Sequence, residues 1–261
     1  MFKELTSVFS LLKSDKFLDS YESVLYLINK GRDKNRKFTH IVSINPEIMV
    51  LSFFNKEFRG VIRKAQFLIA DGVGVVVAAK ILYNRKLVRV TGSGLIEKIL
   101  NSAKIGSFRV LLIGGRPGLA KKISDCYNSK SKKIFCLGIE GIKDIKNVKK
   151  KEIKEIKSIV SSFKPHIVFL AFGSPNQEIF AWRYRDLFDK NIVVGVGGGF
   201  DYLGGVVPRA PKLLRKYGLE WLFRLIVQPK RVFRQARLLV FVLFILILYV
   251  YYSFKKVFGN K

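Results

Sequence analysis

Asp71 lies where a carboxylate could act as a general base. It follows the apolar run Phe67–Ala70 and precedes Gly72 and Gly74, and glycine lets the backbone turn at a strand end without steric crowding. A carboxylate held there can take a proton from an attacking hydroxyl group. The alternative is structural, because an aspartate just before a helix that begins near Gly72 also caps that helix. From the spacing alone, capping is the favoured interpretation.

Ser43 and Asn45 stand at the end of an earlier apolar run. The Asn45 amide can hydrogen-bond hydroxyl or acetamido groups of a ligand, and Ser43 adds a hydroxyl close by. The alternative for Asn45 is a turn residue before Pro46. Both residues are candidates for the catalytic site.

Two glycine-rich blocks follow strand-like apolar runs in the second half of the chain. The block G-S-P-N-Q-E (Gly173–Glu178) follows Ile167–Phe172, and the block G-V-G-G-G-F-D (Gly195–Asp201) follows Ile192–Val194. Polar residues and glycines at the carboxyl ends of strands form ligand sites in open α/β sheets. Tight turns without a ligand are the structural alternative for the glycines.

Gly114 and Gly115 open a third glycine cluster, G-G-R-P-G, between a predicted strand and a predicted helix. Backbone N–H groups in such a position can bind a phosphate, although the cluster is neither a G-x-G-x-x-G nor a Walker A pattern. Arg89 offers a planar cationic fork that suits a diphosphate or a sugar ring oxygen. An exposed ion pair is the alternative for Arg89.

The chain becomes strongly basic after Asp201. Residues 202–237 contain a single acid, Glu220, and their many cationic side chains interleave with apolar ones. Such a segment can lie as an amphipathic helix on an anionic membrane. A terminal helix that packs on the core and keeps a solvated basic face is an equally good interpretation.

The next stretch, residues 238–254, carries no charge and is followed by Lys255 and Lys256. As a helix it would be roughly 25 Å long, slightly less than the hydrocarbon core of a bilayer. We therefore predict a membrane segment that either spans the bilayer or lies in one leaflet, with a buried core segment as the alternative. Basic residues are denser on its N-terminal side, which predicts that the rest of the chain faces the cytoplasm.

The candidate residues require a scaffold that gathers strand ends. Apolar runs alternate with helical patterns, which predicts an α/β fold with a mostly parallel sheet and helices on both faces. We expect two α/β halves, residues 1–104 and 105–201, around a ligand cleft, then a helical basic appendage at 202–237 that docks on the membrane, and the apolar tail at 238–254. The predicted strands are Thr39–Ile44, Phe67–Ile69, Phe108–Ile113, Ile134–Leu137, Ile167–Phe172 and Ile192–Val196. The predicted helices include Glu47–Lys64, Gly94–Ala103, Leu119–Ser129 and Val148–Phe163.

Composition narrows the classes of function. The chain has 261 residues and a formal net charge of +29, which favours an anionic partner. No RNA- or DNA-binding motif accompanies that charge, so nucleic acid is not expected. Cys126, Cys136, His40 and His166 lack metal-ligand spacing, and a D-x-D motif is absent. We predict no metal and no cofactor, and Met1–Leu12 does not read as a signal peptide.

Several ordered blocks resemble the WecG/TagA/CpsF family of glycosyltransferases. S-I-N-P-E (Ser43–Glu47) is similar to the family's T-x-N-x-E, and A-D-G-V-G-V-V (Ala70–Val76) to its D-G-x-G block. R-V-T-G-S-G (Arg89–Gly94) is similar to its R-x-x-G-S-D, and L-L-I-G-G-R-P-G (Leu111–Gly118) to its glycine turn. The two glycine-rich blocks described above and the basic segment continue the resemblance to about residue 231.

The resemblance implies an inverting, metal-independent transfer of N-acetylmannosamine, or a related sugar, from a UDP-sugar to polyprenyl-diphosphate-linked N-acetylglucosamine. Such an enzyme would act in cell wall or surface polysaccharide synthesis, for example of teichoic acid, at the cytoplasmic face of the membrane. It would contact membrane lipid, and self-association within the family leaves a homo-oligomer open. A UDP-sugar-binding membrane protein with lost or altered activity is the alternative.

The resemblance also assigns roles to individual residues. Asp71 matches the family's general base. The family's nucleotide-sugar contacts lie in the blocks that contain Gln177, Glu178, Gly197, Phe200 and Asp201. Its appendage supplies arginines near the active site, where they would neutralise the leaving UDP. The arginines in the matching blocks are Arg209, Arg215, Arg224 and Arg231.

Gly94 departs from the family pattern, which has aspartate after G-S. The missing carboxylate is expected to alter donor or acceptor preference or to weaken activity. It is the feature that favours binding without transfer.

Overall fold

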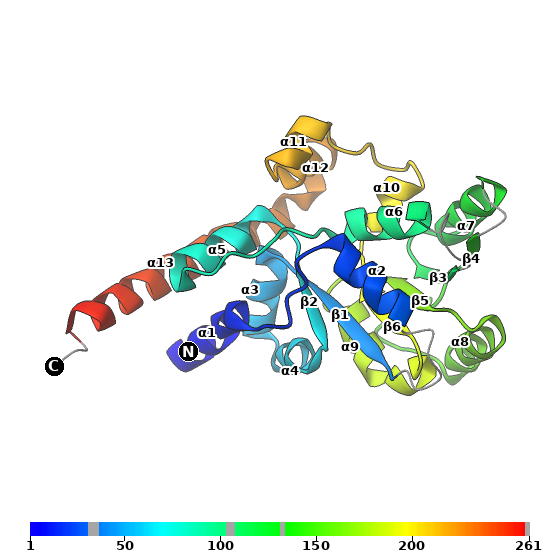
Figure 1. The fold of residues 1–261 in the computed structure, drawn as a ribbon, viewed down its shortest axis with the longest axis horizontal. Helices are drawn as coiled ribbons and strands as arrows, with labels where there is room; N and C mark the ends of the chain where they lie inside the picture. The colour runs from blue at the N-terminus through cyan, green and yellow to red at the C-terminus, as the bar shows by residue number, and fades with distance from the viewer. Residues whose placement is uncertain (31–36, 103–107, 131–133, 259–261) are drawn as a thin grey trace.

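The computed structural model describes residues 1–30, 37–102, 108–130 and 134–258, and its centre is a six-stranded parallel sheet (Figure 1). The strand order is β2-β1-β6-β5-β3-β4. All six predicted strands are confirmed, because strands buried on both faces read as continuous apolar runs. The strands are β1 (Thr39–Ile44), β2 (Phe67–Ala70), β3 (Phe108–Gly114), β4 (Ile134–Ile139), β5 (Ile167–Ala171) and β6 (Ile192–Gly195).

Helices cover both faces of the sheet, as predicted. Successive side chains of a strand point to opposite faces, so Ile41 packs with α2, α6, α7 and α10, whereas Val42 packs with α1, α3, α4 and α5. The helices before β4 are α1 (Phe2–Phe9), η1 (Ser10–Lys13), α2 (Tyr21–Lys30), α3 (Pro46–Phe54), α4 (Lys56–Lys64), α5 (Val73–Tyr83), α6 (Gly92–Ser102) and α7 (Leu119–Lys130). Those after β4 are α8 (Lys150–Phe163), α9 (Asn176–Arg183), η3 (Arg185–Phe188), α10 (Gly199–Leu203), α11 (Lys212–Lys216), α12 (Glu220–Val227), η4 (Pro229–Arg231) and α13 (Val232–Phe258).

The two predicted halves share one sheet. β1, from the first half, pairs with β6, from the second, through Thr39 with Ile192, His40 with Val193 and Ile41 with Val194. The predicted boundary at residue 104 lies outside the described residues, as does Ala103, the end of a predicted helix.

The prediction of one helix over Glu47–Lys64 is wrong, because the chain forms α3 and α4 with a break at Asn55. Asn55 has extended backbone angles, φ −120° and ψ 105°, and its side chain accepts a hydrogen bond from the Phe58 N–H. Asparagine is favoured at this capping position. Apolar residues continue at helical spacing on both sides of Asn55, so the hydrophobic periodicity alone does not reveal the break.

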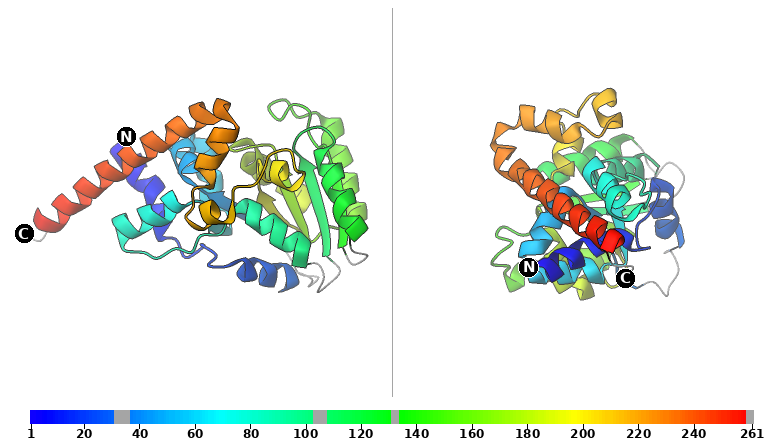
Figure 2. Two further views of the ribbon diagram at one scale, coloured as in Figure 1. Left: turned by 90° about the horizontal axis from the view of Figure 1, so that it is seen from above. Right: turned by 90° about the vertical axis from the view of Figure 1, so that its left-hand side faces the viewer.

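The apolar tail is part of α13, which begins at Val232 and so includes the last basic residues of the appendage. One side of α13 packs against α1, α3 and α5, and it buries Phe241 and Leu248 there. By length and composition, residues Val232–Lys256 could span a membrane; their most apolar 18-residue window has a mean hydropathy of 2.2, and 11% of that window is buried. The N-terminal helix α1 lies at the end of the molecule toward which α13 extends (Figures 1 and 2).

Candidate functional site

A pocket of about 400 Å³ lies at the carboxyl ends of β1, β2, β5 and β6, beneath α12 and η4. The strand order places these four ends next to one another, as expected for a ligand site in an open α/β sheet. Its lining residues come from both predicted halves of the chain and from the basic appendage. The structure thus brings together the predicted residues Ser43, Asn45, Asp71, Arg89, Gln177, Gly197, Arg224 and Arg231.

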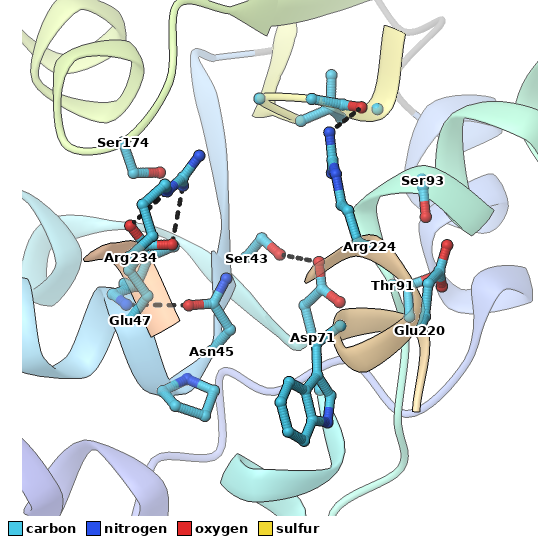
Figure 3. Close-up of a pocket in the computed structure, with 18 of the residues that line it drawn as sticks. Ser43, Asn45, Glu47, Asp71, Thr91, Ser93, Ser174, Glu220, Arg224 and Arg234 are labelled. Atoms are coloured by element: carbon cyan, nitrogen blue, oxygen red, sulfur yellow. Dashed lines mark hydrogen bonds and ion pairs between the residues drawn. The ribbon is translucent and has the colours of Figure 1, made fainter. Parts of the chain in front are cut away.

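Asp71 lies on the pocket wall immediately after β2 (Figure 3). Its Oδ2 accepts hydrogen bonds from the Ser43 hydroxyl at 3.0 Å and from the Gly92 N–H at 3.1 Å. Desolvation raises the pKa of Asp71, and the hydrogen bonds from Gly92 and Ser43 oppose that rise. The cap of α5 is Gly72, which makes no side-chain cap bond, so Asp71 is held toward α6 and the pocket rather than used to cap α5.

Asn45 has a structural role and also lines the pocket. Its Oδ1 accepts a hydrogen bond from the Ile48 N–H at 2.9 Å and so caps α3, whose first residue is Pro46. The capping bond uses the carbonyl oxygen of the amide. The Asn45 NH₂ group is therefore the part that can donate to a ligand.

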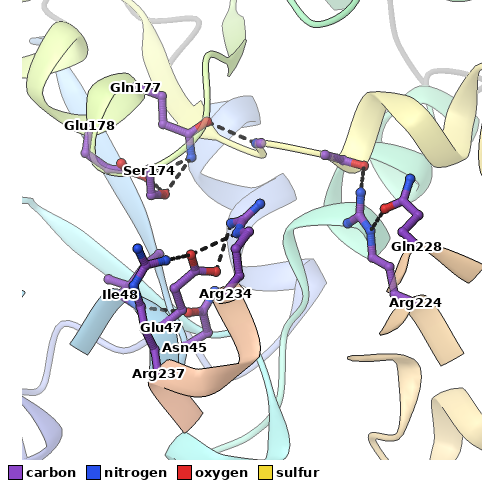
Figure 4. A network of polar contacts seen from close by, with 12 residues as sticks. Asn45, Glu47, Ile48, Ser174, Gln177, Glu178, Arg224, Gln228, Arg234 and Arg237 are labelled. Atoms are coloured by element: carbon purple, nitrogen blue, oxygen red, sulfur yellow. Dashed lines mark hydrogen bonds and ion pairs between the residues drawn. The ribbon is translucent and has the colours of Figure 1, made fainter. Parts of the chain in front are cut away.

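Glu47 belongs to the pocket, although the sequence argument did not select it. The Arg234 side chain donates to both Glu47 oxygens at 2.9 and 2.8 Å, and Arg237 donates to Oε1 at 2.7 Å (Figure 4). These bonds fasten the first turns of α13 to the start of α3. The glutamate of the S-I-N-P-E block was the available signal, but nothing in the sequence identified its partners.

Gln177 and Glu178 form a small network that holds the glycine loop after β6 (Figure 4). Glu178 is 1% exposed, and its Oε1 accepts hydrogen bonds from the Gln177 NH₂ at 2.7 Å and the Ser174 hydroxyl at 2.8 Å. Gln177 Oε1 in turn accepts from the Gly197 N–H at 3.0 Å. Burial raises the pKa of Glu178, against the lowering effect of the hydrogen bonds from Gln177 and Ser174. Glu178 lies behind the pocket and positions Gln177, which lines it.

Arg224, Arg231 and Arg234 line the pocket, and Arg224 and Arg234 lie close enough to Arg231 to affect its charge. Arg224 donates to Asp201 Oδ2 at 3.2 Å and to the Gly198 carbonyl at 3.3 Å. A Cβ at position 198 would collide with the Arg224 guanidinium, so glycine is what allows this approach. Burial and the neighbouring Arg224 and Arg234 lower the pKa of Arg231 to about 10, which still leaves it charged at neutral pH. Such a cluster attracts a multiply charged anion.

Arg89 also lines the pocket, and it links the core to the appendage. Its guanidinium donates to the backbone carbonyl of Arg215, so Arg215 contributes a carbonyl rather than its side chain to this contact. Arg209 lies outside the pocket lining, where it pairs with Glu97 and Glu220.

Four other predicted residues do not line the pocket. β5 lies between β3 and β6, and the Gly114 and Gly115 turn after β3 is outside the residues that line the pocket. A Cβ on Gly114 would collide with Phe172, and one on Gly115 would press on Phe200. Phe200 is buried beneath this turn, and Asp201 pairs with Arg224 and Arg116. The prediction that Gly114 and Gly115 bind phosphate gains no support from this placement.

Several lining residues were missed by the sequence argument. Trp221 and Glu220 belong to the G-L-E-W block, and Ser93 to the R-V-T-G-S-G block, so their motifs were visible without a role for these positions. The missed residues that carry polar or aromatic side chains are Glu47, Thr91, Ser93, Ser174, Tyr202, Glu220, Trp221, Arg234 and Gln235.

Gly94 lies beside the pocket but does not line it. A Cβ at this position would collide with the Tyr21 hydroxyl and with Thr91. Tyr21 and Thr91 hydroxyls lie 3.2 Å apart, and the Thr91 N–H donates to the Tyr21 hydroxyl at 3.2 Å. Tyr21 therefore fills the space that a larger residue 94 would need, and the absence of a carboxylate at position 94 leaves the hydrogen bonds of Asp71 intact.

The described residues contain no group of three or more His, Cys, Asp and Glu side chains that could hold a metal ion. His40, one of the candidate ligands considered from the sequence, is fully buried, and burial lowers its pKa to about 3. The cationic side chains that line the pocket are arginines, Arg89, Arg224, Arg231 and Arg234.

Residues 12–257 match the family described as glycosyl transferase WecG/TagA/CpsF family. The chain is 33% identical over 228 residues to an N-acetylglucosaminyldiphosphoundecaprenol N-acetyl-beta-D-mannosaminyltransferase of Bacillus spizizenii, covering 87% of this chain and 80% of the relative. It is 30% identical over 191 residues to a protein of the same description from Bacillus subtilis, covering 73% of this chain and 72% of the relative.

Proposed function

The chain belongs to the WecG/TagA/CpsF family of glycosyltransferases, and we propose that it transfers N-acetylmannosamine, or a related sugar, from a UDP-sugar to polyprenyl-diphosphate-linked N-acetylglucosamine. The observation that carries this proposal is the pairing, across one pocket, of a desolvated carboxylate with a cluster of arginines. The two Bacillus relatives are described as N-acetylmannosaminyltransferases that act on N-acetylglucosaminyldiphosphoundecaprenol, which supports the proposed sugar and acceptor.

The arrangement supports a direct displacement. Asp71 takes the proton from the acceptor hydroxyl, whose oxygen attacks the anomeric carbon of the donor sugar. The bond between that carbon and the diphosphate breaks, the configuration inverts, and UDP leaves with the bonding electrons. Arg224 and Arg231 are placed to stabilise the charge that develops on the diphosphate, so the reaction does not require a metal ion. No cofactor takes part.

The acceptor brings the enzyme to a membrane. Its polyprenyl chain stays in the bilayer while its diphosphate lies among the headgroups, and the basic appendage places the pocket at that level. We assign the enzyme to the cytoplasmic face of the cell membrane, where a UDP-sugar is available, and to wall or surface polysaccharide synthesis. A homo-oligomer is compatible with this assignment.

The reaction is tested with detergent-purified full-length protein, UDP-N-acetylmannosamine and a short-chain polyprenyl-diphosphate N-acetylglucosamine. We expect UDP release that requires both substrates and that is unchanged by EDTA or added Mg²⁺. Release that depends on Mg²⁺ would refute the metal-independent mechanism. If UDP is not released with this pair but is released with another UDP-sugar, the assignment of the donor is wrong while that of the reaction class stands.

The Gln177–Glu178 network predicts different effects for two substitutions at one site. Glu178→Gln keeps an oxygen that can accept from Gln177 and Ser174, and it should change the KM for the UDP-sugar little. Glu178→Leu removes one of the two acceptors of the buried Gln177 NH₂ group and leaves it only the Ser174 hydroxyl. The loss costs about 1–3 kcal/mol and should raise that KM by about 5- to 150-fold, because 1.4 kcal/mol is about tenfold. Steady-state kinetics on both variants, with a thermal melt of each, checks the pair. Equal KM values for the two variants would show that the network does not position the loop.

A further inference from the structure

The outer face of α13 is apolar. We define it as Leu239, Val242, Leu243, Leu246 and Val250, whose side chains are between 47% and 74% exposed. These residues recur along a helix of 27 residues, so they form a continuous stripe. An apolar surface of this extent marks contact with a membrane or a partner.

The inner face of α13 is attached to the body of the protein along its length. Near its start, Phe241 stacks on Phe9 with ring centroids 5.6 Å apart. Near its end, the hydroxyls of Tyr252 and Tyr83 lie 3.4 Å apart, and the Tyr251 ring contacts Phe2 at 4.5 Å. A helix held in this way cannot cross a bilayer without taking α1 and the end of α5 with it.

The end of α5 is in turn tied to the edge of the sheet by charged residues. Arg85 follows Tyr83 by two residues and pairs with Asp15 at 3.1 Å. Directly after Asp15, the chain forms backbone hydrogen bonds with Leu68 of β2, at 2.9 and 2.8 Å. A spanning α13 would therefore draw Asp15, Arg85 and their neighbours through the hydrocarbon core, where ionised side chains are expensive.

Basic side chains mark both ends of α13. Arg234 and Arg237 lie in its first turns and Lys255 and Lys256 in its last. A groove beside the far end is lined by Lys13, Arg85 and Lys256 together with tyrosines 83, 249 and 252. Cations and tyrosines are the side chains that settle at the headgroup level of a membrane, so each end of the helix suits a headgroup region, and the attachment of α13 to α1 and α5 requires that both ends lie at the same surface.

We propose that α13 lies in the plane of a single leaflet of an anionic membrane, with its outer face among the acyl chains and both basic ends among the headgroups, and does not cross the bilayer. The apolar outer face supplies burial, and the flanking cations supply attraction to anionic lipid. A second copy of the chain is a poorer occupant, since contact through this face would bring like charges at the helix ends together. Trp221 of α12 and Leu238 of α13 both line the pocket, so an α13 that lies in the leaflet brings the pocket to the headgroup level. The in-plane placement of α13 does not depend on the proposed chemistry.

A cysteine at the far end of α13 tests which side of the membrane it occupies. Ser253 is exposed there, and Ser253→Cys is made in a chain with Cys126→Ser, since Cys126 is the exposed native thiol and Cys136 is buried. The native Cys126 reports the side of the core. A membrane-impermeant maleimide, applied to vesicles that expose either face of the expressing cell's membrane, should label Ser253→Cys and Cys126 from the same face. Labelling of Ser253→Cys from the opposite face, or only after detergent, would overturn the in-plane placement.

A second experiment measures what the outer face binds. Leu243→Gln together with Leu246→Gln keeps the charge and removes apolar surface, and should weaken binding to phosphatidylglycerol vesicles by at least about tenfold. The control is Phe135→Gln, at a residue that is 52% exposed on the edge strand β4, and it should bind as the parent does. Both variants should melt at the temperature of the parent. Unchanged vesicle binding by the double variant, or loss of an oligomer without loss of vesicle binding, would refute the proposal.

Discussion

Asp71→Asn should lower the rate of sugar transfer by about 10²- to 10⁴-fold, the contribution of a well-placed general base. The substitution keeps an oxygen that can accept the hydrogen bonds from Ser43 and Gly92, so the pocket should retain its shape and the KM for the UDP-sugar should stay close to that of the parent. UDP release with both substrates present measures the effect. Asp125→Asn, on the exposed face of α7, is the control for an aspartate lost elsewhere, and transfer by Asp71→Asn at the parent's rate would remove Asp71 from the mechanism.

The same substitution should make the protein more stable at neutral pH. Desolvation raises the pKa of Asp71 in the folded state, so the folded protein holds this proton more tightly than the unfolded chain does. Any stability gained in this way is complete below the unfolded pKa and is lost as the pH rises through the folded pKa. At neutral pH the ionised carboxylate is a cost, which the neutral amide removes, so a higher Tm should accompany the loss of activity.

The raised pKa also predicts a pH dependence. The base acts only when ionised, so transfer should fall as the pH decreases through the folded pKa of Asp71. The Ser43 hydroxyl lowers that pKa through its hydrogen bond. Ser43→Ala should therefore move the acidic limb of the rate profile to higher pH, whereas a purely structural role for Ser43 would reduce the rate equally at every pH.

The strands and the strand-end residues could be predicted because their signals are local. Parallel strands buried on both faces are continuous apolar runs, and the polar residues directly after β1, β2, β5 and β6 fall at one edge of the sheet. The order of the strands is not a local property. For this reason Gly114 and Gly115 look in the sequence like the other strand ends, although β5 lies between β3 and the strands β6 and β1 at the centre of the pocket.

Contacts between distant residues explain most of what the sequence argument missed. Glu47 becomes part of the site because Arg234 and Arg237 reach it from 187 and 190 residues away. The tail is a similar case, since the sequence predicts a membrane segment but leaves open whether it spans the bilayer or lies in one leaflet. The contacts of α13 with α1 and α5 bury one face of the helix against the protein. These contacts are the reason for expecting the other face to lie in one leaflet.

Arg231→Met should lower kcat/KM by about 10²- to 10³-fold, which is the usual loss when one group that stabilises transition-state charge is removed. Arg231 gives the most direct test of the arginine cluster. Among the described residues its side chain makes no hydrogen bond or ion pair, whereas Arg224 and Arg234 are held by Asp201 and Glu47. Arg231 is a half-buried cation beside two other cations, Arg224 and Arg234, and such an arrangement favours the binding of an anion.

The stability of this variant separates a ligand-binding role from a structural one. Burial and its two arginine neighbours lower the pKa of Arg231 to about 10, which means that the folded state disfavours its charge. Arg231→Met should therefore raise the Tm of the free protein. It should also reduce the further rise that UDP gives the parent, since the stabilisation by a ligand at a given concentration increases with the logarithm of its affinity. Lys212→Met, on the exposed side of α11, should change neither. A lower Tm with an undiminished response to UDP would show that Arg231 supports the fold and leave the diphosphate to other residues.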